Sequence, residues 1–132
     1  MNFPYVKLPG LSKRPLIETY FRYKNTSLKN PVLCLVDSGA DISYFDMDLA
    51  SELGLDVPKL RQVDSWDISG NRFWGGVSNI VVIIGGHEFE IPAIFSDQII
   101  RSFCVLGQEG LFDQARVIFE RYKWNLDIRP VR

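Results

Sequence analysis

Histidine is nearly absent from this chain of 132 residues, which has one, at position 87. A single histidine excludes most histidine-based metal sites, and a Ser–His or Cys–His catalytic pair would depend on His87 alone. Cysteine is almost as rare, and both residues, Cys34 and Cys104, lie within apolar runs. We expect them to be reduced thiols in the core and not a disulfide.

Long apolar runs are also missing, because none approaches the roughly 20 residues that cross a bilayer. Residues 1–14 contain Pro4, Pro9 and Gly10 where a secretion signal would need an apolar block. No charge of one sign dominates, since 15 basic and 16 acidic residues give a net charge of −1. The chain therefore lacks the excess of basic residues that is typical of nucleic-acid-binding proteins. The sequence therefore predicts a cytoplasmic protein that binds neither a membrane nor nucleic acid.

Short strand-like runs separated by turn residues fill most of the chain. Residues 1–14 are expected to form an arm or an edge strand, which leaves 15–132 as one domain. Strands are expected at 16–23, 32–36, 80–84, 88–95 and 103–106, with a hairpin within 63–76 and a closing hairpin at 116–120 and 123–128. Short helices are expected at 46–54 and 108–114. This pattern predicts a compact, mostly β, barrel-like fold.

The most informative stretch is Val-Leu-Cys-Leu-Val-Asp-Ser-Gly-Ala-Asp at residues 32–41. Five apolar residues predict a buried strand that leads directly into Asp37. An ionised acid beside a core costs several kcal/mol unless it is hydrogen-bonded or protonated, so an acid is placed there mainly where its chemistry is used. Ser38 can hydrogen-bond across a turn, Gly39 allows a close backbone approach, and Ala40 leaves room. A structural acid that caps a turn is the alternative interpretation.

This stretch resembles the active-site turn of the retropepsin-like aspartic proteases. A second match lies 69 positions later, where Val105-Leu106-Gly107 resembles the family's hydrophobic-hydrophobic-Gly strand that precedes a short helix. The resemblance covers the chain from about Pro15 to the C-terminus. It implies a retropepsin-like acid-protease β-barrel that hydrolyses peptide bonds without a metal or a cofactor.

Carboxylate-based hydrolysis of a peptide needs two acids that share one proton. No second Asp-Ser/Thr-Gly occurs, because Asp97, Asp113 and Asp127 are followed by glutamine, glutamine and isoleucine. Asp37 would therefore have to meet its own copy across a two-fold axis, which implies a homodimer. A non-catalytic member of the family, serving as a peptide-binding or dimerisation module, is the alternative function.

The resemblance also assigns roles to the neighbouring residues. Asp37 is the catalytic acid/base, and Ser38 ties the two active-site turns together across the dimer. A peptide substrate in extended conformation would bind along the cleft floor. The remaining site residues form the active-site turn (Gly39, Ala40 and Asp41), the flap (Ser69, Gly70 and Asn71) and the second-strand/helix turn (Leu106, Gly107 and Gln108). An ordinary surface turn is the alternative interpretation of residues 69–71.

Two features depart from the viral members of the family. Gln108 stands where those members have an arginine that pairs with the acid of the turn, so the bridge to Asp41 is expected to be lost or replaced by a neutral hydrogen bond. The hairpin after the second helix is longer, so the dimer sheet is expected to be built differently. A cluster of four acids within twelve positions could suggest a cation site: Asp37, Asp41, Asp46 and Asp48. They lack the order of a calcium-binding loop, and Asp46 and Asp48 are better explained as helix-start charges.

Overall fold

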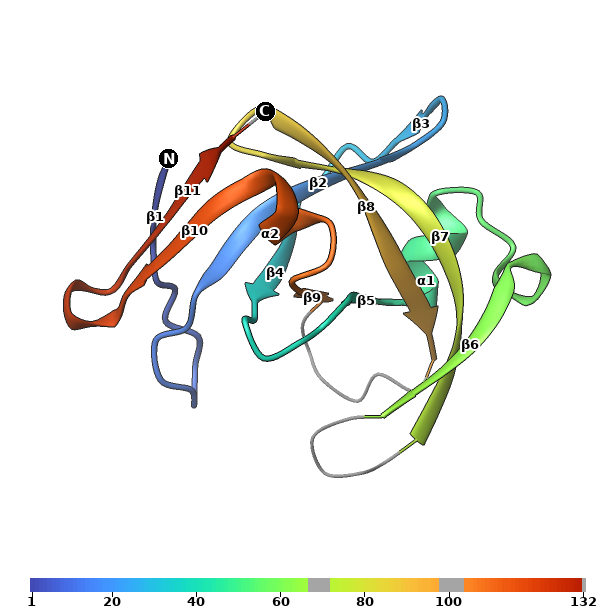
Figure 1. Ribbon diagram of the computed structural model, residues 1–132, viewed down its shortest axis with the longest axis horizontal. Helices are drawn as coiled ribbons and strands as arrows, with labels where there is room; N and C mark the ends of the chain where they lie inside the picture. The colour runs from blue at the N-terminus through green and yellow to red at the C-terminus, as the bar shows by residue number, and fades with distance from the viewer. Residues whose placement is uncertain (67–71, 98–103, 132) are drawn as a thin grey trace.

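The computed structural model describes residues 1–66, 72–97 and 104–131, and these residues form mainly β-strands (Figure 1). The larger sheet contains β2 (Leu16–Tyr23), β3 (Thr26–Ser27), β4 (Val32–Val36), β5 (Ser43–Asp46), β6 (Arg61–Trp66), β7 (Arg72–Ile84), β8 (His87–Ser96) and β9 (Cys104–Leu106). The terminal sheet contains β1 (Asn2–Pro4), β10 (Ala115–Glu120) and β11 (Asn125–Pro130). The helical segments are α1 (Met47–Glu52), α2 (Leu111–Gln114) and the 3₁₀ turns η1 (Val57–Lys59) and η2 (Arg121–Lys123). The predicted mostly β fold is confirmed.

The larger sheet closes on itself to form a barrel. Its strands are bonded in the order β3-β2-β4-β9-β5-β8-β7-β6, and β2 pairs with β7 as well as with β4. The long antiparallel hairpin of β7 and β8 runs in register from Gly76↔Phe95 to Ile84↔His87. Strand β9 comes late in the chain and lies between β4 and β5, so distant segments meet at the centre of the sheet.

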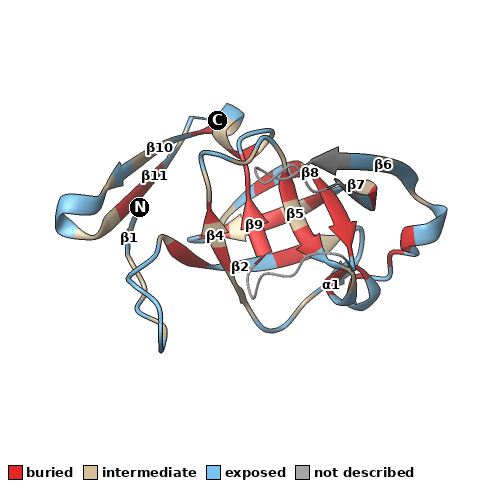
Figure 2. Ribbon diagram, turned by 90° about the horizontal axis from the view of Figure 1, so that it is seen from below, coloured by how far each residue is buried: buried red, intermediate tan, exposed pale blue. Residues whose placement is uncertain are grey.

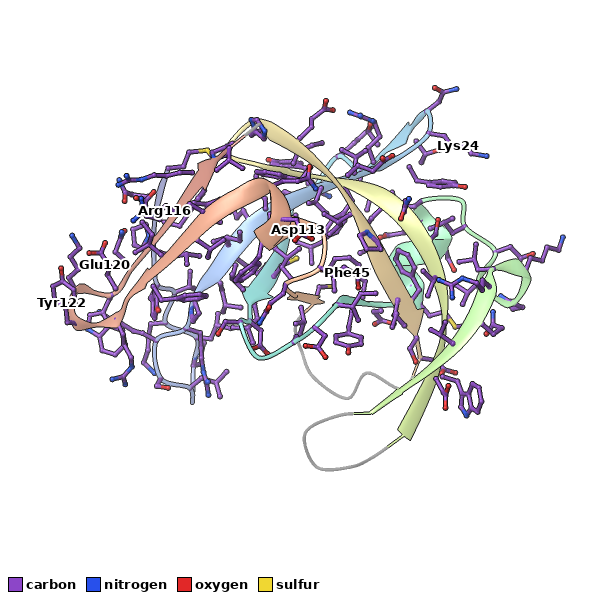
Figure 3. The ribbon with its side chains drawn as sticks, viewed as in Figure 1. Lys24, Phe45, Asp113, Arg116, Glu120 and Tyr122 are labelled. Atoms are coloured by element: carbon purple, nitrogen blue, oxygen red, sulfur yellow. The ribbon has the colours of Figure 1, made fainter. Side chains whose placement is uncertain are left out.

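Alternation of side chains builds the barrel core. Along β7, Ile80, Val82 and Ile84 are buried while the residues between them are partly exposed. Phe45 lies in the interior of the barrel in Figure 3, with its ring centroid 5.1 Å from that of Phe21. Each fully buried ring of this size stabilises the fold by roughly 1.5–3 kcal/mol. Figure 2 shows the same pattern, with buried residues concentrated on the barrel strands.

The terminal sheet lies beside the barrel and has three strands among the described residues. Its centre strand β11 pairs with β1 on one side and with β10 on the other. Leu126 and Ile128 of β11 are fully buried and belong to the main core, whereas the β10–β11 hairpin extends away from the barrel (Figures 1 and 2). Residues 2–4 thus form an edge strand, and the predicted domain boundary after residue 14 stays a prediction.

The first helix confirms the role predicted for the acids near its start. Asp46 is the N-cap of α1, and its side chain accepts a hydrogen bond from the Asp48 backbone N–H at 3.3 Å. Gly54 follows the helix with φ +81°, a conformation that glycine adopts without steric cost.

The second helix begins three residues later than predicted. The backbone N–H groups of Gln108 and Glu109 donate to the carbonyls of Ala40 and Asp41 in the turn after β4, at 2.9 and 2.8 Å. Gly110 then has φ +92°, so a regular helix cannot begin before Leu111. The bonds to the distant turn replace the first turn of the predicted helix.

The predicted hairpin within 63–76 has its two strands in place. β6 and β7 pair antiparallel from Arg61↔Val77 to Trp66↔Arg72. The predicted flap residues Ser69, Gly70 and Asn71 lie outside the described residues.

Candidate active site

Parallel pairing of β4 with β9 brings the two predicted motifs together. The register pairs Cys34 with Cys104, Leu35 with Val105 and Val36 with Leu106, and the Asp37 N–H continues the ladder by donating to the Leu106 carbonyl at 3.0 Å. Asp37 and Gly107, which are 70 residues apart in the sequence, therefore follow the ends of neighbouring strands. The meeting of these two motifs, inferred from the resemblance, is present in the structure.

The turn after β4 holds the Asp37 carboxylate at the surface of the barrel. Its Oδ1 accepts a hydrogen bond from the Gly39 N–H at 2.8 Å, and its backbone carbonyl accepts from the Ala40 N–H at 3.2 Å. No other described residue donates a hydrogen bond to this carboxylate, which is half-buried next to an exposed Ser38. One carboxylate oxygen is thus fixed by the turn, and the other can act on a bound group.

Gly107 is required because the turn passes directly over it. A Cβ atom at this position would lie 2.4 Å from the Ile42 carbonyl oxygen and 2.8 Å from that of Ala40. Both are backbone atoms, which cannot move aside as the end of a side chain can. The glycine therefore permits the close contact between the two halves of the site.

Gln108 contacts the turn in a way that the sequence only partly predicts. Its side-chain amide donates a hydrogen bond to the Ser38 carbonyl oxygen. The neutral hydrogen bond is thus present, but it goes to the backbone of the turn and not to the Asp41 side chain. Asp41 is exposed and forms no ion pair with any described residue.

Ser43 is a supporting residue that sequence reasoning missed. It is fully buried on β5, and its Oγ accepts a hydrogen bond from the Gly107 N–H at 3.1 Å. A buried hydroxyl on a strand needs a hydrogen-bond partner. The position of this serine directly before Tyr44 and Phe45 was the one sequence signal for such a buried polar contact.

No group of three or more His, Cys, Asp or Glu residues in 1–66, 72–97 and 104–131 is arranged to hold a metal ion. Within the same described ranges, no helix is long and apolar enough to cross a membrane.

Two solved structures resemble this fold over most of their length. One is a retropepsin-like aspartic protease from Rickettsia conorii, with a TM-score of 0.67 at 18% identity over 96% of this chain and 97% of that one. The other is the EIAV protease complexed with the inhibitor HBY-793, with a TM-score of 0.54 at 17% identity over 77% of this chain and 88% of that one. No protein-family model matches the sequence, and no curated protein matches it. The chain therefore has the retropepsin-like fold, that of the proteases which its strand-and-turn motif resembles.

Proposed function

We propose that this chain is an aspartic endopeptidase whose active site forms when Asp37 of two copies meet across a two-fold axis. The observation that carries the proposal is the turn after β4, which fixes one oxygen of a half-buried Asp37 carboxylate by the Gly39 N–H at 2.8 Å. The similarity in fold to two aspartic proteases supports it. The chain supplies one such turn, so a second copy must supply the other carboxylate.

The chemistry follows from two carboxylates about 3 Å apart, which cannot both ionise and therefore share one proton. The ionised carboxylate removes a proton from water, and the water oxygen attacks the peptide carbonyl carbon. The protonated carboxylate donates its proton to the carbonyl oxygen. Collapse of the tetrahedral species then breaks the C–N bond as a proton passes to the leaving nitrogen.

The surrounding residues have supporting roles in this proposal. The Gly39 N–H keeps each carboxylate oriented, and Gln108 braces the turn through the Ser38 carbonyl. Ser38 would link the two turns across the axis, and residues 69–71 would close over an extended peptide as a flap. Asp41 would bind the backbone of that peptide.

Cleavage of a mixed peptide library by the wild type and by Asp37→Asn tests the proposal, with the mass in solution recorded for both. We expect a dimeric wild type that cleaves with a bell-shaped pH profile, and an equally folded Asp37→Asn dimer with a rate lower by at least about 10³-fold. Asp56→Asn is the matched control, because Asp56 is exposed and, among the described residues, forms an ion pair only with the exposed Lys59. A mutant that cleaves as fast as the wild type would overturn the proposal. A wild-type dimer that cleaves nothing would favour a peptide-binding or dimerisation module.

A further inference from the structure

The two cysteines of the chain lie directly opposite each other on the strands that carry the candidate site. Cys34 on β4 is in register with Cys104 on β9, so their side chains point to the same face of the sheet. Both are free thiols in the main core, with 0% and 9% of their surfaces exposed. Neighbouring strands lie about 4.8 Å apart, and a disulfide joins Cα atoms about 4.4–6.8 Å apart, so the positions suit a bond without a change of register.

The two thiols are not equivalent. Their side chains lie on the same face of neighbouring strands, and the Cys34 thiol donates a hydrogen bond to the Val32 carbonyl oxygen at 3.7 Å. Burial raises the pKa of the Cys34 thiol well above its usual value, and the contact with Cys104 adds to this rise. The neighbouring Cys34 thiol lowers the pKa of the Cys104 thiol, and this effect exceeds the opposing effect of burial. Cys104 is therefore the more readily ionised and the more accessible thiol.

We propose that Cys34 and Cys104 form a dithiol that reacts with a hydroperoxide and closes to a disulfide between β4 and β9. The Cys104 thiolate attacks the peroxide O–O bond, forming a sulfenic acid and releasing hydroxide, or an alkoxide from an organic peroxide. The Cys34 thiol then attacks the Cys104 sulfur and the sulfenic oxygen leaves as water. Two thiols are oxidised and one peroxide is reduced, and a small thiol reductant reverses the change.

The bond would act on the candidate site because each cysteine lies three residues before a central site residue, Asp37 or Gly107. A disulfide holds its Cβ atoms about 3.8 Å apart, closer than opposite side chains on neighbouring strands. With the register kept, drawing the two Cβ atoms together would displace the backbone around the hydrogen bond from the Asp37 N–H to the Leu106 carbonyl. We expect peptide cleavage to fall at least about 10-fold, because small displacements of catalytic groups are costly. This consequence rests on the proposed function, whereas the disulfide does not.

The test treats the full chain with hydrogen peroxide and measures its mass after unfolding and alkylation. We expect a loss of about 2 mass units with neither cysteine alkylated, a melting temperature several degrees higher, and full reversal by dithiothreitol. Cys34→Ala should instead stop at a Cys104 sulfenic acid that dimedone traps, and Cys104→Ala should resist oxidation. Circular dichroism establishes that both variants are folded.

Two results would overturn the disulfide: two alkylatable thiols after treatment, or a bond between chains in place of one within a chain. Faster oxidation at Cys34 than at Cys104 would overturn the assigned order of attack. An oxidised protein that cleaves as fast as the reduced one would overturn only the effect on the site. If the reduced protein cleaves nothing, the proposed function fails, and mass and melting temperature still decide the disulfide.

Discussion

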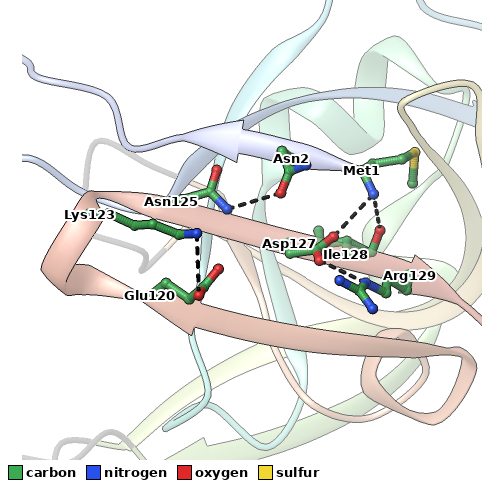
Figure 4. A network of polar contacts seen from close by, with 8 residues as sticks. All are labelled: Met1, Asn2, Glu120, Lys123, Asn125, Asp127, Ile128 and Arg129. Carbon is green, nitrogen blue, oxygen red and sulfur yellow. Dashed lines mark hydrogen bonds and ion pairs between the residues drawn. The ribbon is translucent and has the colours of Figure 1, made fainter.

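The turn after β4, which carries Asp37, and the terminal sheet are held together by different kinds of interaction. Around the turn, the polar contacts are neutral donors, such as the Gly39 N–H and the Gln108 amide, bonded to main-chain or carboxylate oxygens. In the terminal sheet, Asp127 is buried between charged groups and accepts hydrogen bonds from the Met1 ammonium at 3.1 Å and from Arg129 Nε at 2.7 Å (Figure 4). The stability of the turn should therefore depend mainly on how closely its backbone packs, and the stability of the terminal sheet should depend on pH.

The two regions also differ in how far apart in sequence their partners lie. The turn depends on pairing between residues about 70 positions apart, with β9 placed between β4 and β5. Most of the terminal sheet is the local β10–β11 hairpin, with Glu120 and Tyr122 at its outer end in Figure 3. A perturbation of the barrel centre should thus reduce both stability and cleavage, whereas one in the sheet should reduce stability alone.

The largest effect is expected for Gly107→Ala. The new methyl group would meet the backbone oxygens of Ile42 and Ala40, so the turn and β9 must separate. We expect a loss of about 3 kcal/mol in the free energy of unfolding, together with loss of cleavage. Denaturant unfolding measures the first quantity, and a peptide assay measures the second.

Gly54→Ala is the control for this substitution. Gly54 also has a restrictive backbone, with φ +81°, but no atom lies within 4 Å of the added Cβ position. Its cost should be only about 1 kcal/mol, with cleavage retained. Equal losses for the two variants would show that the close contact at Gly107 is unimportant.

Two glutamines, one that contacts the turn and one that does not, test the role of the turn more finely. Gln108 braces the Ser38 carbonyl of the turn, whereas Gln114 at the end of α2 donates to the carbonyls of Glu90 and Gly110 at 2.9 and 2.8 Å. Substitution of either by alanine should cost about 1 kcal/mol in unfolding free energy. Only Gln108→Ala should also lower kcat, by roughly 10-fold, because it frees the turn that carries Asp37. Equal kcat values for the two variants would contradict this distinction.

The smallest effect concerns the pH dependence of the terminal sheet. Burial of the Asp127 carboxylate raises its pKa, but hydrogen bonds from the Met1 ammonium and Arg129 outweigh burial and leave the pKa below its usual value. A lowered carboxylate pKa contributes stability above the unfolded-state value, and this contribution is lost as the pH falls through the folded-state value. Melting temperatures recorded from about pH 7 to pH 3 should therefore fall less steeply for Asp127→Asn than for the wild type. Identical slopes would show that this carboxylate contributes nothing to acid sensitivity.

Much of the fold was predictable because strand signals are local. The β-prone run at 80–84, the alternation at 88–95, the apolar run before Asp37 and the closing hairpin each appear within a few residues of sequence. The structure confirms these strands, and it confirms α1 with Asp46 as its cap. The approach of Asp37 to Gly107 could be inferred only from two motifs taken together, because the register that joins them is not encoded locally.

The features that sequence reasoning missed depend on distant partners. Strand β5 exists because β8 and β9 pair with it, and its four residues carry little periodicity of their own. The late start of α2 has the same cause, since Gln108 and Glu109 bond to the turn in place of their helical partners. The pairing of Cys34 with Cys104 needed the register of two strands. In each case the structure depends on contacts between residues distant in sequence, which local secondary-structure propensity does not reveal.

In the proposed dimer, each active site contains Asp37 from two chains, and a subunit-mixing experiment tests this arrangement most directly. Wild type and Asp37→Asn are mixed in equal amounts, allowed to exchange subunits, and assayed at constant total protein. If both carboxylates are needed, only wild-type pairs cleave, and random pairing leaves about one quarter of the activity of pure wild type. An equal mixture with Asp56→Asn should keep full activity. Retention of about one half of the activity with Asp37→Asn would mean that each chain acts alone, which would contradict the account.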